Sequence, residues 1–221
     1  MRKGTPVQYV IRLLFYILGL FCLAMGVAVS INSDLGVSPV NSLPYIISQI
    51  SGFALSSCVT GIFCFYILLQ FIILRRNFNP INCLQIAFSF IFGYFTGFTK
   101  ALIGTWAIPT YPGRLLMLAI SIVFIALGVV FYVDAELVPM PMEGLSLTLA
   151  KLTNTPFPTM KTIVDCVVVA TGIVLSFLFL HGLFGIREGT VVTALTVGKL
   201  VAILRKPIRP IMNRLCFGEK A

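Results

Sequence analysis

Carboxylate, hydroxyl and amide side chains recur at two places in a chain that has little other charge. The first place carries Asp34, Ser38 and Asn41, and the second carries Glu136 and Glu143. A carboxylate at membrane depth is costly to bury and is therefore a functional hypothesis by default. Such groups could bind a cation, an ammonium group or a proton that couples transport. We predict that these five residues contribute to one substrate-binding site.

A structural role for the same residues is the competing interpretation. Asp34 and Glu136 could end helices and face water. Asn41 and Glu143 stand three residues after an expected helix cap, where a capping-box side chain satisfies free backbone amides. The helix N-termini expected there carry partial positive charge and could also receive a carboxylate or a phosphate. An acid and a helix N-terminus in one cavity would suit a zwitterion or a small polar solute.

These residues belong to a segment that occurs twice at a constant offset of 102 residues. Each copy is an apolar stretch that ends in an acid and Leu, followed by a short loop and a second helix that opens with Pro. A register without gaps through two helices and a loop indicates an internal repeat. The matched positions are Gly26, Asp34, Pro39, Asn41 and Leu43 in the first copy, and Gly128, Glu136, Pro141, Glu143 and Leu145 in the second.

Composition places the chain in a membrane. Hydrophobic residues make up 58% of the 221 residues and charged residues only 10%, whereas a soluble domain has roughly 25% charged residues. The net charge of +9 is then a topology signal and a sign of contact with anionic lipid, and it does not indicate nucleic-acid binding. We expect a single membrane domain over residues 1–221, with the lipid bilayer as its surroundings.

The sequence contains no recognisable arrangement of catalytic or metal-binding residues. The six cysteines form no CxxC pair, and the single histidine, His181, has no partner at metal-ligand spacing. There is no nucleophile–base pair and no Gly-rich phosphate loop. We therefore expect that the protein is not an enzyme, that it has no catalytic residues, and that it binds no metal and no cofactor.

Six apolar segments are long enough to cross a bilayer, which takes about 20 residues. Two further helices of about 12 residues, 39–50 and 141–152, open with Pro at the first helical position and are too short to cross. Repeat one covers about 9–103, repeat two about 114–205, and 206–221 is a basic tail. Gly93 and Gly198 are expected to let helices pack closely. The six spans are 10–31, 55–74, 81–103, 114–133, 159–180 and 189–204.

Charge decides whether the short helices cross. If both dip in and return on the same side, twelve Lys and Arg residues share one face and only Lys100, Arg114 and Arg187 lie on the other. This distribution fits the positive-inside rule, so both termini are expected to be cytoplasmic. Because each repeat has an odd number of spans, three, the second repeat must be inverted relative to the first. The twelve are Arg2, Lys3, Arg12, Arg75, Arg76, Lys151, Lys161, Arg205, Lys206, Arg209, Arg214 and Lys220.

The expected fold is therefore an all-α membrane protein with six transmembrane helices and two short re-entrant helices, built as two inverted-topology repeats. Many secondary transporters have this architecture, with the substrate site at the repeat interface. Asp165 lies one helical turn after Lys161 and is expected to pair with it, although a role facing the cavity is open.

The segment from Gly26-Val27 through Asp34-Leu35-Gly36-Val37-Ser38-Pro39 resembles the YczE/YyaS/YitT-like family of bacterial integral membrane proteins. The resemblance covers about residues 9–204 and includes Glu188-Gly189-Thr190. The second copy departs from the pattern, with Val138-Pro139-Met140 in place of Gly36-Val37-Ser38. The resemblance implies a multi-pass protein of the bacterial plasma membrane.

Two functional hypotheses follow. The first is a transporter or permease for a small polar solute, zwitterions included. The second is the substrate-capture subunit of a multi-subunit importer, which would need a coupling subunit; a homo-oligomer is also open. Translocation of a lipid or a lipid phosphate is a weaker third hypothesis. It would require Arg at the tips of the re-entrant helices, and these tips have none.

Overall fold

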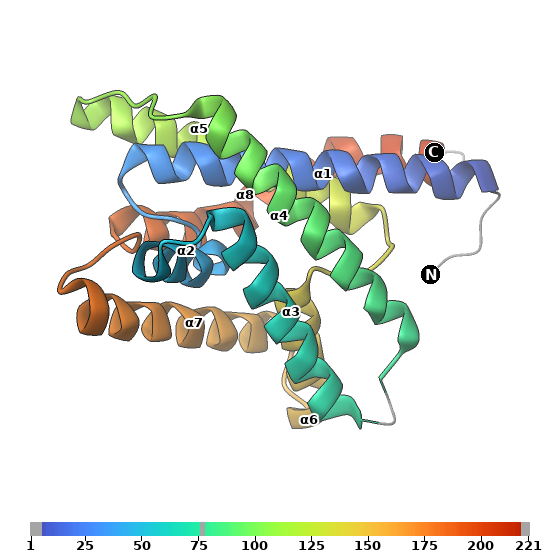
Figure 1. The fold of residues 1–221 in the computed structure, drawn as a ribbon. Coiled ribbons are helices and arrows are strands. Elements are labelled where there is room, and N and C mark those ends of the chain that lie inside the picture. The colour runs from blue at the N-terminus through green and yellow to red at the C-terminus, as the bar shows by residue number, and fades with distance from the viewer. Residues whose placement is uncertain (1–5, 76–77, 218–221) are drawn as a thin grey trace.

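The computed structural model describes residues 6–75 and 78–217, and the regular elements of this part of the chain are helices (Figure 1). The basic residues Arg2, Lys3, Arg76 and Lys220, which entered the charge count, lie outside the described residues. The elements are α1 (Pro6–Ser33), α2 (Pro39–Ser51), α3 (Leu55–Leu74), the 3-10 helix η2 (Pro80–Cys83), α4 (Leu84–Ile103), α5 (Tyr111–Asp134), α6 (Pro141–Thr153), α7 (Phe157–Leu180) and α8 (Glu188–Phe217).

Within the described residues, five helical segments are long and apolar enough to cross a membrane: α1, α3, η2 with α4, α5 and α7. The sequence analysis expected a sixth span at 189–204. In the structure this segment is the first half of α8, which continues through Pro207 and Pro210 to Phe217. Lys199, Arg205 and Lys206 lower the apolar character of this helix, so length and composition alone do not identify it as a span.

The two short helices form where the sequence predicted them. Both have 13 residues and carry proline at the first helical position, Pro39 in α2 and Pro141 in α6. Proline suits this position because its missing N–H would have no helical partner there. Gly52 ends α2 and Asn154 ends α6, both in the left-handed conformation. At a rise of 1.5 Å per residue each helix is about 20 Å long, short of the roughly 30 Å hydrocarbon core.

Helices α1 and α5 cross closely and run antiparallel. A Cβ atom at Gly19 would lie 2.8 Å from the carbonyl oxygen of Gly128, and one at Gly26 would lie 2.9 Å from that of Ser121. Only small residues allow two helix backbones to approach this closely. The crossing therefore depends on glycine, and the side chains beside it form the middle of the core.

The remaining helices pack around this crossing. Helix α2 lies against α7, and α3 lies against α6. Gly93 of α4 meets Thr60 and the carbonyl of Ser56 in α3, as predicted for a close helix contact. Gly198 of α8 differs from the prediction, since a Cβ there would meet no described atom within 4 Å. Helices α7 and α8, unlike α3 and α4, make few contacts with each other.

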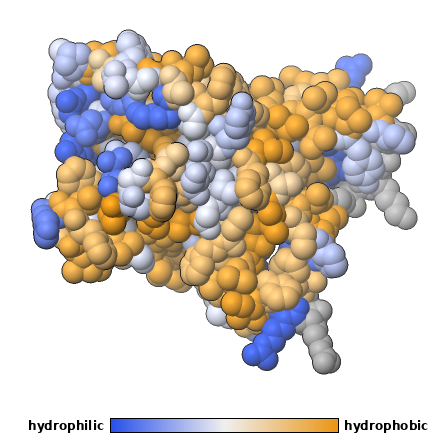
Figure 2. Space-filling view, in the orientation of Figure 1, coloured by the Kyte–Doolittle hydropathy of each residue, from blue (hydrophilic) through white to orange (hydrophobic). Residues whose placement is uncertain are grey.

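The outer surface is mostly apolar, as expected for contact with lipid. Figure 2 shows hydrophobic residues over most of this face, while hydrophilic residues gather at the end where α1 stops and α5 begins. The beginning of α1 and the end of α8 lie together at the opposite end of the molecule (Figure 1).

Candidate functional site

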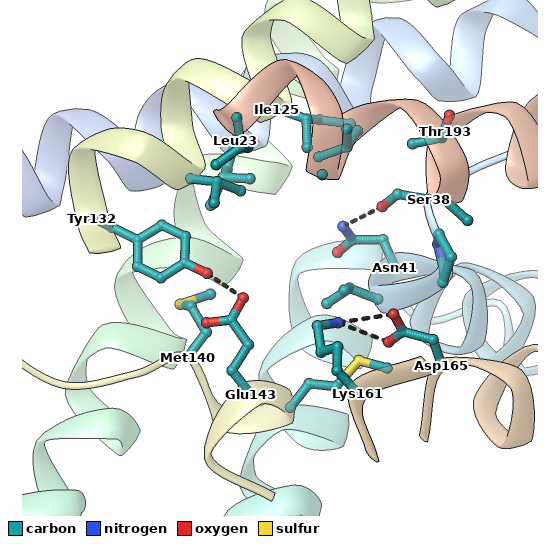
Figure 3. A pocket seen from close by; sticks show the side chains of 18 of the residues that line it. Leu23, Ser38, Asn41, Ile125, Tyr132, Met140, Glu143, Lys161, Asp165 and Thr193 are labelled. Atoms are coloured by element: carbon teal, nitrogen blue, oxygen red, sulfur yellow. Dashed lines mark hydrogen bonds and ion pairs between the residues drawn. The ribbon is translucent and has the colours of Figure 1, made fainter. Parts of the chain in front are cut away.

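A cavity of about 320 Å³, called the central cavity below, lies between the first turns of α2 and α6 and the crossing of α1 with α5. Side chains from all the helices α1 to α8 contribute to its lining, and most of them are apolar. Leu23 and Ile125, which pack at the α1–α5 crossing, form part of this lining. Figure 3 shows the polar residues converging on this space from α2, α5, α6 and α7.

The first turn of α2 supplies Ser38 and Asn41. Ser38 is the residue before the helix, and Asn41 stands three positions later, so the two side chains meet: Asn41 Nδ2 donates to Ser38 Oγ at 3.1 Å. Both residues line the central cavity and are buried, with Asn41 only 4% exposed. The Oδ1 atom of Asn41 has no hydrogen-bond partner among the described residues.

The first turn of α6 supplies Glu143 at the matching position. Its carboxylate accepts hydrogen bonds from the Tyr132 hydroxyl of α5 and from the Met140 backbone, which precedes the helix. Glu143 is thus a capping residue, as the structural interpretation proposed, and it also lines the central cavity. One role does not exclude the other, because only part of the carboxylate is used by the cap.

Helix α7 adds an ion pair to the cavity wall. Lys161 Nζ lies 2.8 and 3.0 Å from the two carboxylate oxygens of Asp165, one helical turn away, which confirms the predicted pairing. Both side chains are mostly buried and line the cavity. On the opposite wall, Thr193 of α8 is 1% exposed, and its Oγ1 has no partner within the described part of the chain.

Asp34 lies outside the central cavity. Its side chain is 59% exposed and forms ion pairs with Arg114, at 3.0 Å, and with Arg187, at 3.2 Å. The Arg187 guanidinium also donates to the Asp34 carbonyl oxygen. Asp34 directly follows α1 in a left-handed conformation, so the chain turns there and the side chain leaves the helix bundle.

Glu136 is likewise exposed and left-handed, two residues after the end of α5. It lines a second cavity of about 460 Å³, called the outer cavity below, which runs along the 136–139 loop. The outer and central cavities share Tyr132, Glu143 and Lys161 in their walls. The structure therefore brings Ser38, Asn41 and Glu143 together in the central cavity. Glu136 shares only the outer cavity with Glu143, and Asp34 lines neither cavity.

Three residues of the central cavity were missed as binding candidates: Tyr132, Thr193 and Lys161. Polar side chains within apolar helices are the sequence signal that could have identified them. That signal is weak, since many such residues pair only with their own helix. Among the described residues, no three His, Cys, Asp or Glu side chains come together as a metal site.

The fold and the cavity define an all-helical membrane protein with a partly polar central cavity. The chain belongs to a family of unknown function, DUF6198, which it matches over residues 10–206. Neither a curated protein nor a solved structure matches the chain.

Proposed function

We propose that this protein is a membrane transporter or permease for a small polar solute, zwitterions included, and that the solute binds in the central cavity. One observation carries the proposal: a cavity at the core of an apolar helical protein is lined by the buried side chains of Ser38 and Asn41, by the partly buried Glu143, and by the Lys161–Asp165 pair. Polar groups of this kind are costly to bury in a membrane protein and commonly mark a substrate or ion pathway.

Two inverted repeats are part of the proposal, and contacts across the offset of 102 residues support it. Arg12 and Arg114 are separated by this offset, and each reaches the loop after the first long helix of the other half. Arg12 donates to the carbonyl oxygens of Ala135 and Glu136, and Arg114 pairs with Asp34. Such a reciprocal pattern is expected from halves related by a two-fold axis.

The α1–α5 crossing supports the same symmetry. Gly26 and Gly128 are equivalent by the offset, and so are Gly19 and Ser121. The contact of Gly26 with Ser121 and that of Gly19 with Gly128 are therefore one contact seen from the two halves. Because the helices are antiparallel, the axis would lie across them and in the membrane plane, as in inverted-topology transporters.

The remaining topology follows from length and charge. We propose that α2 and α6 are re-entrant, that the first half of α8 is the sixth span, and that both termini are cytoplasmic in a bacterial plasma membrane. The positive-inside distribution supports this arrangement, as does the resemblance to the YczE/YyaS/YitT-like family. The start of α1 and the end of α8 lie at the same end of the molecule, which also agrees with this topology (Figure 1).

The outer cavity suggests the route to the site. It lies along the loop that holds Glu136, and it meets the central cavity at Tyr132 and Glu143. We propose that a solute enters or leaves past the hydrogen bond between these two side chains. Glu136 then lines this route, and Asp34 belongs to the loop that closes the protein on the opposite face.

Transport can be tested by current measurements on proteoliposomes adsorbed to a solid-supported membrane. Concentration jumps of amino acids and small amines should produce transient currents with the wild-type protein, and Glu143→Gln should remove them. Glu188→Gln is the matched control, because it removes an exposed acid at the start of α8 that lines neither the central nor the outer cavity. Equal currents from Glu143→Gln and wild type would contradict the proposed site. Binding without any current would instead favour the capture-subunit hypothesis.

A further inference from the structure

We infer that the solute of the central cavity is a small organic ammonium ion, an inference that rests on the proposed transport function and names its substrate class. The choice lies between a cation, a zwitterion and an anion. Three features of the cavity decide it: the charge of its walls, the hydrogen-bonding groups left free, and the apolar surface beside them.

With Glu143 ionised, the walls carry a net negative charge. Their charged side chains are Glu143, Lys161 and Asp165. Lys161 is bound by both oxygens of Asp165, so this pair is neutral as a unit. Ionised Glu143 then leaves one negative charge in a space that is mostly apolar. A monocation would neutralise this charge, a zwitterion would leave it unchanged, and an anion would double it.

The helix N-termini offer few donors to an anion. Pro39 and Pro141 have no N–H at the first helical position. The Asn41 N–H donates to the Ser38 carbonyl oxygen, and the Met140 N–H donates to the Glu143 carboxylate. Part of the amides that usually bind carboxylate or phosphate at a helix start is therefore removed or used. This argues against the carboxylate end of a zwitterion as well as against an anion.

Free acceptors, in contrast, face the cavity. Asn41 is 4% exposed, lines the cavity, and has an Oδ1 atom without a partner among the described residues. Figure 3 shows the Asn41 amide and the Glu143 carboxylate on facing sides of the same space. An ammonium group carries only donors, so it could bind Glu143 and Asn41 Oδ1 at once.

Apolar surface beside these acceptors fits a short hydrocarbon body. The rings of Phe63 and Phe92 stack with their centroids 5.6 Å apart and line the cavity. Aromatic faces of this kind also attract cations. On the α8 side, a Cβ at Gly198 would meet no described atom within 4 Å, so this wall leaves room. The volume of about 320 Å³ is at the small end of ligand sites, which commonly measure roughly 300–1,000 Å³.

Four probes with the same five-carbon body test the charge preference: pentylammonium, 5-aminopentanoate, pentanoate and pentanol. Each is added to the purified full-length protein in detergent, and thermal unfolding is followed by size-exclusion chromatography after heating. We expect that, of the four probes, only pentylammonium stabilises the wild type, raising its melting temperature by on the order of 3 °C at about ten times its Kd. Glu143→Gln, which keeps the size of the side chain and removes its charge, should abolish this shift, and Glu188→Gln should keep it.

The outcomes separate the substrate class from the function. Stabilisation by 5-aminopentanoate, pentanoate or pentanol in preference to pentylammonium would overturn the ammonium assignment and leave a binding cavity that transport could still use. A pentylammonium shift that survives in Glu143→Gln would also overturn it, because the cation would then bind elsewhere. A shift lost in Glu143→Gln but present in Glu188→Gln would support it. Absence of a shift with all four probes would overturn the ammonium assignment, while the current measurements would decide the transport function independently.

Discussion

Replacing Arg12 by Met should destabilise the protein far more than the same change at Arg114, although the two arginines occupy equivalent positions of the repeat. Arg12 is fully buried, and its guanidinium donates to the carbonyl oxygens of Ala135, at 2.7 Å, and Glu136. Met keeps the length of the aliphatic stem and removes the donors. The buried carbonyl groups of the loop after α5 would then lose their hydrogen-bond donor.

The expected magnitude follows from the two contacts. A hydrogen bond to a charged group contributes about 1.5–3 kcal/mol, so losing both should lower the free energy of unfolding of Arg12→Met by about 3–6 kcal/mol. The Arg114 side chain is 35% exposed and its partner Asp34 is 59% exposed. After Arg114 is replaced, Asp34 still has its ion pair with Arg187. Such a surface pair contributes about 0–1 kcal/mol.

The assay is the melting temperature in detergent, measured by the fraction of monodisperse protein after heating. For a chain of this size 1 kcal/mol corresponds to roughly 2–4 °C, so Arg12→Met should lose on the order of 10 °C and Arg114→Met no more than about 4 °C. Arg12→Lys keeps the charge without the planar fork and should fall between Arg12→Met and wild type. Equal losses for Arg12→Met and Arg114→Met would refute the reasoning from burial.

Three further predictions address packing, topology and a second buried ion pair. Gly93→Leu should lower the melting temperature strongly, because a side chain there meets α3. Gly198→Leu should fold normally and weaken ligand binding, because the new side chain fills part of the cavity. A larger loss of melting temperature in Gly198→Leu than in Gly93→Leu would show that the cavity is wrongly placed. A cysteine at position 107 in a cysteine-free background should react with a membrane-impermeant maleimide added outside the cell, and labelling only from the cytoplasm would exclude the proposed topology. Asp134→Asn should cost about 1–3 kcal/mol of unfolding free energy, since the 3% exposed carboxylate of Asp134 accepts from Arg205 at 2.6–2.8 Å; an unchanged melting temperature would show that Arg205 finds another partner.

Local sequence signals were sufficient for the class of protein and for most of the helices. Hydropathy located the five helical segments that are long and apolar enough to cross a membrane, because about 20 apolar residues have few stable arrangements other than a helix in lipid. Pro39 and Pro141 marked the starts of the short helices, because proline is favoured in the first turn of a helix and disfavoured in later turns. The pairing of Lys161 with Asp165 was also predictable, because side chains four residues apart on a helix are neighbours.

Tertiary structure decided which of the polar residues share the cavity. Asp34 and Asn41 are only seven residues apart, yet Asn41 faces the cavity and Asp34 faces Arg114 and Arg187. The direction of each side chain depends on the turn after α1 and on partners 80 and 153 residues away, and no local pattern contains that information. In the same way, Gly198 looks like a packing glycine in the sequence, and only the separation of α7 from α8 makes it part of a cavity wall.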